Sequence, residues 1–137
     1  MRISDQTQNI MRLLSQVILA DGHILPSEIE ALIRSVQGLE LTDSEGDVLR
    51  SPQIRNWFDG YLQELNDAPS EMSKEVALTH LILSLAEWPN KKAVVEALEK
   101  ISQADADFHI EEKLLISIVK AYWQYDGLDA LGAKIKV

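Results

Sequence analysis

The chain has 137 residues, of which 46% are hydrophobic and 26% charged, as is typical of a soluble globular protein with a sizeable core. Thirteen Lys and Arg residues against 22 Asp and Glu residues give a net charge of −9. This charge disfavours binding to the phosphates of nucleic acids and to anionic membrane surfaces. Because the chain has no cysteine, disulfide scaffolds, thiolate zinc sites and cysteine nucleophiles are excluded.

The N-terminal segment does not have the pattern of a secretory signal, because Asp5 and Gln8 interrupt any apolar run. The most apolar stretch, residues 76–86, is too short to span a bilayer and contains polar side chains. We therefore expect a single soluble domain over residues 1–137, located in the cytoplasm and without direct membrane insertion.

Apolar residues recur at three- and four-residue steps in six parts of the chain, and this spacing predicts six helices. Their apolar stripes lie at residues 10–18, 29–36, 54–65, 76–85, 94–101 and 114–123. A short additional helix is predicted after Gly127. No segment has the alternating pattern of a strand. The sequence therefore predicts an all-α fold, a compact bundle of about six to eight helices.

Local signals predict where some of these helices begin. Ser27 and Glu30 have the spacing of a capping box at the start of the second helix. Residues 42–45 have the same spacing, which predicts a short helical turn before the third helix.

The fourth helix, predicted over residues 70–87, is apolar on nearly every side. A helix of that kind is usually the central one of a bundle. We expect it to be the most buried helix, and we expect His80 within it to be a buried histidine.

The chain has an internal repeat at an offset of 84 residues, which aligns Asp21 with Asp105 and Glu28 with Glu112. In each copy an apolar helix ends in Ala-Asp, and an apolar residue follows three positions after the Asp. A Glu lies seven positions after the Asp, where the next helix begins. This order of parts predicts two pseudo-repeated helical halves.

The two copies, residues 20–32 and 104–116, resemble the helix–turn–helix signature of the tellurite-resistance TerB family. That signature reads Ala-Asp-Gly, then an apolar residue, then the Glu and a further apolar residue. The second copy departs from it by having Ala106 in place of the Gly. The resemblance extends over roughly residues 4–125. It implies an all-helical fold of two related halves and an acidic cluster that binds divalent metal, formed by Asp21, Glu28, Asp105 and Glu112.

The resemblance also implies a role in resistance to tellurite or to other chemical stress. No catalytic reaction is established for the family as a whole. Because a similar domain lies on the cytoplasmic side of a membrane-anchored J-domain co-chaperone, the implied partners are divalent cations and a protein of a membrane-associated stress complex.

The chemistry of such a cluster can be assessed from its residue types. Crowded carboxylates repel one another unless a cation neutralises them. Ligands that are all oxygen favour Ca²⁺, Mg²⁺ or Mn²⁺ over Zn²⁺. Asp107 and Glu111 could add ligands to the second copy, while His23 and His109 would admit a softer metal.

Three alternatives stay open. The acids could be purely structural, because a helix ends at Asp21 and a charge such as that of Glu28 stabilises a helix N-terminus. The protein could be a metal-independent interaction module whose acidic face docks a basic partner. We do not expect an enzyme, since the chain has no phosphate-binding loop, nucleophile elbow or zinc-protease helix. The remaining enzymatic alternative is a paired-carboxylate hydrolase.

Residues 43–47 are expected to form an exposed acidic turn.

Overall fold

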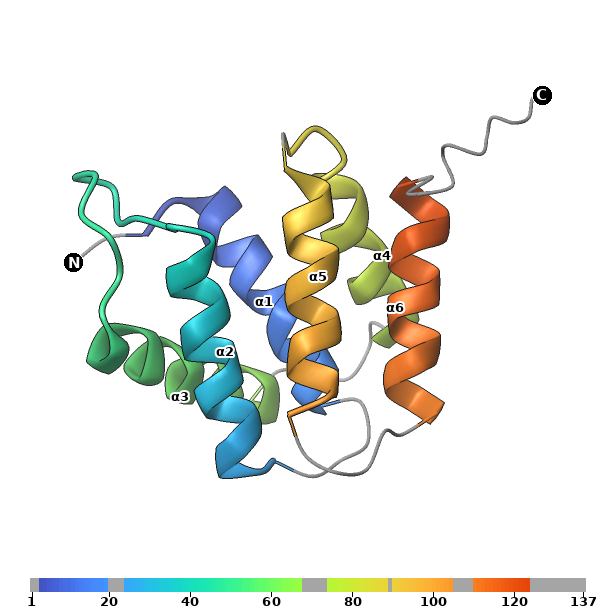
Figure 1. Ribbon diagram of the computed structural model, residues 1–137, viewed down its shortest axis with the longest axis horizontal. Coiled ribbons are helices and arrows are strands. Elements are labelled where there is room, and N and C mark those ends of the chain that lie inside the picture. The colour runs from blue at the N-terminus through green and yellow to red at the C-terminus, as the bar shows by residue number, and fades with distance from the viewer. Residues whose placement is uncertain (1–2, 20–23, 68–73, 89, 105–109, 124–137) are drawn as a thin grey trace.

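The computed structural model describes residues 3–19, 24–67, 74–88, 90–104 and 110–123, and within them it contains six helices and no strand (Figure 1). The all-α prediction is therefore confirmed. The helices are α1 (Asp5–Leu19), α2 (Pro26–Gly38), α3 (Ser51–Asp67), α4 (Lys74–Ser84), α5 (Lys91–Ser102) and α6 (Ile110–Trp123). The helix predicted after Gly127 lies outside the described residues.

Helix α1 is the centre of the bundle, because it packs against α2, α4, α5 and α6. Its apolar stripe is broad enough to face several neighbours at once. The side chains that α1 buries are Thr7, Ile10, Met11, Leu13, Leu14, Ser15, Val17 and Ile18.

The prediction that the fourth helix is central was wrong. Although α4 buries Ile82 completely, Leu83 is 55% exposed and His80 is also exposed. The helix packs against α1 and α6. Its apolar residues are spread around the helix instead of forming one stripe, so some of them face away from the core.

Helix α5 lies between α2 and α6 on the face seen in Figure 1. The colour order of the ribbon shows that α2 and α5 run in opposite directions. In the described residues no helix is both long enough and apolar enough to cross a bilayer.

Helix α3 packs against α2 and is also joined to α1 by hydrogen bonds. The amide nitrogen of Gln16 donates to the hydroxyl of Tyr61 at 2.8 Å, and the indole N–H of Trp57 donates to the side chain of Gln8 at 3.3 Å. The rings of Trp57 and Tyr61 stack with their centroids 5.2 Å apart.

The segment between α2 and α3 is a turn, not the short helix that the second capping-box pattern predicted. Thr42 and Val48 form an isolated antiparallel bridge. Between them, the carboxylate of Asp43 accepts the backbone N–H groups of Glu45 and Asp47 at 2.9 and 3.1 Å. An Asp side chain that bonds to nearby backbone groups in this way stabilises a turn at the expense of a helix.

The two helical pairs predicted by the internal repeat, α1 with α2 and α5 with α6, are both present as helices. That they are related halves of one repeat stays a prediction.

Candidate functional site

The structure describes two of the four predicted metal ligands, Glu28 and Glu112. Asp21 and Asp105 lie outside the described residues, as do His23, Asp107 and His109 and the side chain of Glu111. The geometry of the predicted site can therefore be followed only from its two glutamates.

Glu28 lies in the first turn of α2, where its carboxylate caps the N-terminus of the helix. Pro26 is the first helical residue, and Leu25 is the N-cap. One carboxylate oxygen of Glu28 accepts the backbone N–H of Leu25 at 3.1 Å. This is the reciprocal half of a capping box, because the apolar side chain of Leu25 cannot supply the other half.

The predicted pairing of Ser27 with Glu30 was therefore wrong by two positions. Because the helix begins at Pro26, the side chain that reaches back to the N-cap is the third helical residue, Glu28. Glu30 instead lies on the outer surface of α2, with its carboxylate 3.8 Å from the guanidinium of Arg34.

The burial of Glu28 is unusual for a carboxylate, since only 1% of its surface is exposed. Asp and Glu are almost never fully buried unless they are paired or bound to a cation. The positive end of the helix dipole offsets part of the cost of burying a charge in the first turn of α2.

Glu112 has the same position in α6 as Glu28 has in α2, since each is the third residue of its helix. Glu112 is fully buried, with none of its surface exposed. In Figure 1 the N-terminal ends of α2 and α6 both lie at the lower end of the bundle. Two acids that the sequence paired thus share helix position, burial and the same end of the molecule.

The remaining described acids do not complete a metal site. Within the part of the chain that the structure describes, no group of three or more His, Asp or Glu side chains is arranged to hold a metal ion. The oxygen donors of Glu28 and Glu112 suit the hard cations expected from the sequence. A complete coordination shell would need ligands from residues outside the described ranges.

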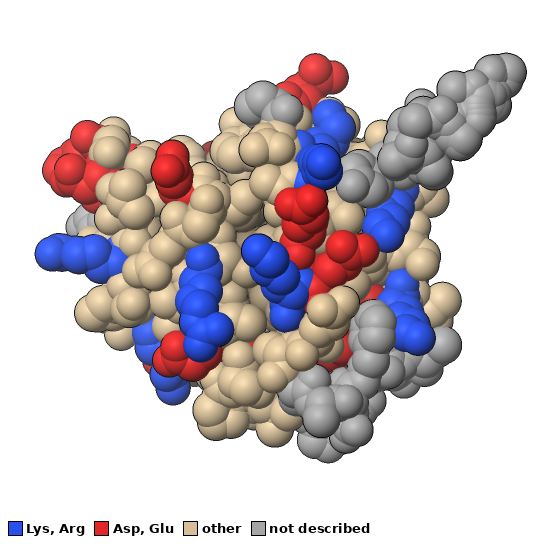
Figure 2. Space-filling model, viewed as in Figure 1, with Lys and Arg blue, Asp and Glu red and all other residues tan. Residues whose placement is uncertain are grey.

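The acidic turn at residues 43–47 is exposed, as predicted, at both Glu45 and Asp47, while Asp43 is half-buried. It forms part of the acidic group at the upper left of Figure 2. The carboxylate of Asp43 is already engaged by two backbone N–H groups, which accounts for its place in the turn.

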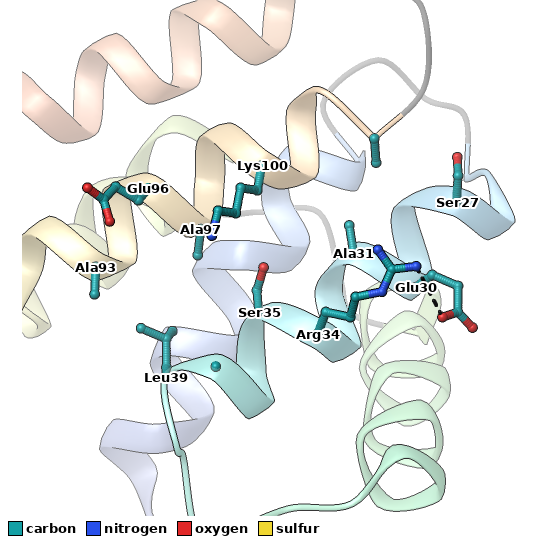
Figure 3. A pocket seen from close by; sticks show the side chains of 12 residues that line it. Ser27, Glu30, Ala31, Arg34, Ser35, Leu39, Ala93, Glu96, Ala97 and Lys100 are labelled. Atoms are coloured by element: carbon teal, nitrogen blue, oxygen red, sulfur yellow. Dashed lines mark ion pairs between the residues drawn. The ribbon is translucent and has the colours of Figure 1, made fainter.

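A surface groove between α2 and α5 was not predicted from the sequence. It has a volume of about 710 Å³, and Ser27 and Ala104 lie at one of its two ends. Figure 3 shows Ala31 and Ser35 of α2 facing Ala97 of α5 across it. The sequence does contain a sign of this groove, because small residues recur at helical spacing on both helices, as at Ala31 and Ser35 or Ala93 and Ala97. A search for stripes of large apolar residues does not detect such positions.

Comparison with known proteins gives no relative, because no protein-family model, curated protein or solved structure matches the chain.

Proposed function

We propose that this protein is a non-enzymatic, TerB-like helical domain that binds a divalent cation at the end of the bundle where α2 and α6 begin. Glu28 and Glu112 would be ligands, together with Asp21 and Asp105. By binding there, the cation would stiffen the two helix junctions in a response to tellurite or other chemical stress. Ca²⁺, Mg²⁺ and Mn²⁺ are the expected cations.

The observation that supports this proposal is the burial of two carboxylates at the same position of two helices. A structural helix cap needs only a solvated carboxylate, as on most helix N-termini. Burial costs a charged group its hydration, and a cation bound between the two carboxylates would offset this loss.

The experiment is thermal unfolding of chelator-treated protein in the presence of Mg²⁺, Ca²⁺, Mn²⁺ or Zn²⁺. A cation that binds only the folded state stabilises it by about 2.7 kcal/mol at a hundredfold excess over its dissociation constant. We expect a saturable increase in the unfolding midpoint with one or more of the oxygen-preferring cations.

The decisive variant is the double substitution Glu28→Gln and Glu112→Gln, which removes both charges while keeping oxygen atoms that can accept hydrogen bonds. It should fold but gain no stability from the cation. The matched control is Glu30→Gln with Glu96→Gln, which removes two exposed charges and should respond like the wild type. The same loss of response is expected for Asp21→Asn with Asp105→Asn.

A midpoint unchanged by all four cations would contradict the proposal. The function to test next would then be the metal-independent docking module, with the exposed acidic turn at residues 43–47 as part of its surface. A pull-down of a basic partner that is sensitive to salt and persists in chelator would support that alternative.

A further inference from the structure

The outer face of α6 is apolar, although this helix lies at the edge of the bundle (Figure 1). Leu114 is 57% exposed, Ile118 39% and Tyr122 49%. These residues are four positions apart, so their side chains lie along one face of the helix. Among the helical side chains that the structure describes, no other helix has more than one large hydrophobic residue exposed in this way.

This face also carries no charge. Over residues 114–122 the other exposed side chains are those of Ser117 and Ala121. The one charged residue of this stretch is Lys120, whose ammonium lies 3.0 Å from the carboxylate of Glu99 in α5. Because the outer face of a surface helix normally carries charged or polar side chains, this composition indicates a surface that another element covers.

The chain leaves α6 at a fixed point beside this face. Trp123, the last residue of the helix, is buried, and its indole is hydrogen-bonded to the backbone of α4. Tyr122 therefore lies next to the position from which the chain continues. The part of the sequence that follows, residues 124–137, lies outside the described residues.

The sequence of residues 124–137 has the pattern expected of a helix that covers an apolar face. Leu128, Leu131 and Ile135 recur at three- and four-residue steps, which predicts one apolar stripe. Gly127 precedes this stripe, and glycine readily adopts the left-handed conformation in which a chain turns after a helix. The sequence therefore favours a reversal of the chain followed by a second helix.

The lengths of the two elements match. A helix over residues 128–137 is about 15 Å long, and the face from Leu114 to Tyr122 is about 12 Å long. The connection, residues 124–127, has a length typical of neighbouring antiparallel helices. So short a connection also gives the segment a local concentration on the order of millimolar at this face, an advantage that a separate partner lacks.

We propose that residues 128–137 form a helix that packs antiparallel against the outer face of α6, so that its apolar stripe covers Leu114 and Ile118. The ring of Tyr122 contributes to the contact while its hydroxyl stays in water, as amphipathic side chains do at the edge of a buried surface. Each element thereby removes apolar surface of the other from water. This inference is independent of cation binding.

The first measurement is amide hydrogen exchange of the full chain. In a helix over residues 128–137, the backbone N–H groups of residues 132–137 bond to carbonyls four positions earlier. We expect these amides to exchange at least about tenfold more slowly than in an unfolded chain. Exchange at the unfolded rate in the wild type would overturn the proposal.

The second test combines substitutions on the two elements. The segment pair is Leu128→Ala with Leu131→Ala, and the α6 pair is Leu114→Ala with Ile118→Ala. Alanine shortens the apolar side chains and preserves helix propensity. Each pair should lower the unfolding midpoint by at least about 3 °C, and the α6 pair should also return the amides of residues 132–137 to the unfolded rate of exchange.

The combination of both pairs should lower the midpoint by little more than one pair alone, because each pair removes the same contact. Fully additive losses would overturn the proposal, and so would a segment pair that leaves the midpoint unchanged.

The matched control is Leu65→Ala in α3, whose side chain is 43% exposed, close to the 39% of Ile118. It should leave the exchange of residues 132–137 unchanged, and its effect on the midpoint should add to that of the segment pair. Sedimentation tests whether a second copy covers the face instead. A dimer that the α6 pair dissociates, with the amides of residues 132–137 unprotected, would overturn the proposal.

Discussion

The indole N–H of Trp123, the last residue of α6, donates a hydrogen bond to the backbone carbonyl of Ile82 in the last turn of α4 at 2.9 Å. The same carbonyl also accepts the backbone N–H of Leu85 at 3.2 Å, so the indole of Trp123 is a second donor to it and comes from a neighbouring helix. Both residues are buried. The contact fixes how the ends of α4 and α6 meet.

We expect Trp123→Phe to lower the free energy of unfolding by about 0.5–1.5 kcal/mol, because it keeps an aromatic ring and removes one buried hydrogen bond, while the carbonyl of Ile82 keeps its bond from Leu85. Urea unfolding followed by circular dichroism measures this loss. The control is Tyr122→Phe, the neighbouring residue, which is 49% exposed and should change stability by less than about 0.5 kcal/mol. Equal losses in the two variants would show that the hydrogen bond has no special part in stability.

A pair of identical substitutions tests whether α1, rather than α4, is the centre of the bundle. Leu14 in α1 has no exposed surface, whereas Leu83 in α4 is 55% exposed. Leu14→Ala should cost about 2–5 kcal/mol of unfolding free energy because it opens a cavity, and Leu83→Ala should cost less than about 1 kcal/mol. Chemical denaturation of both variants gives the comparison. If Leu83→Ala is the more costly of the two, the assignment of α1 as the central helix is wrong.

The sequence predicted the helices well where the apolar stripe is one-sided. In α1 and α5 the spacing of apolar residues identified the buried face, including Leu14 and Leu98. This spacing did not predict the buried face of α4. Apolar residues on every side of a helix indicate that it can be buried, but they do not indicate which sides other helices cover. Leu83 is exposed since none of the described helices covers its side of α4, and the arrangement of neighbouring helices is a property of the whole fold.

Aromatic residues show the same limit at single-residue scale. Trp123 and Tyr122 both belong to the apolar stripe predicted at residues 114–123, yet only Trp123 is buried. Successive helical residues point about 100° apart, so near the end of a helix a small rotation decides which of two neighbours faces inward.

The candidate site could be predicted by position but not by environment. The repeat and the family resemblance singled out Glu28 and Glu112, while nothing in the sequence indicated that either carboxylate would be buried. Burial of the first turn of a helix depends on which elements lie over it. The start of α2 was misplaced because Ser27 followed by Glu30 matches the capping-box pattern, whereas the true N-cap, Leu25, is apolar and gives no such signal.

The hydrogen bond from Leu25 to Glu28 predicts a difference between two glutamates of the same helix turn. Glu28→Ala should destabilise the protein by about 1–3 kcal/mol in chelator, because it removes the acceptor of the Leu25 N–H at the start of α2. Glu30→Ala should have an effect of less than about 0.5 kcal/mol, since its ion pair with Arg34 is exposed. Thermal and urea unfolding of both variants provides the measurement. Similar losses for the two would argue that Glu28 does not hold the helix start.

Tyr61 makes the stability of the protein depend on pH in the alkaline range. Burial raises the pKa of the Tyr61 phenol above its ordinary value. The hydrogen bond donated by Gln16 and the charge of Arg12 act in the opposite direction but do not cancel this increase. The folded protein therefore keeps the phenol proton at a pH where the unfolded chain has begun to lose it.

The stability that Tyr61 contributes should be fully present below the ordinary tyrosine pKa of about 10 and should be lost as the pH rises through the higher pKa of the folded state. We expect the free energy of unfolding of the wild type to fall over this window more steeply than that of Tyr61→Phe. Urea unfolding at a series of alkaline pH values measures both slopes, and phenolate absorbance follows the titration itself. Tyr122→Phe, which removes an exposed phenol, should keep the wild-type slope. If Tyr61→Phe has the same slope as the wild type, burial of the phenol does not govern the loss of stability at alkaline pH.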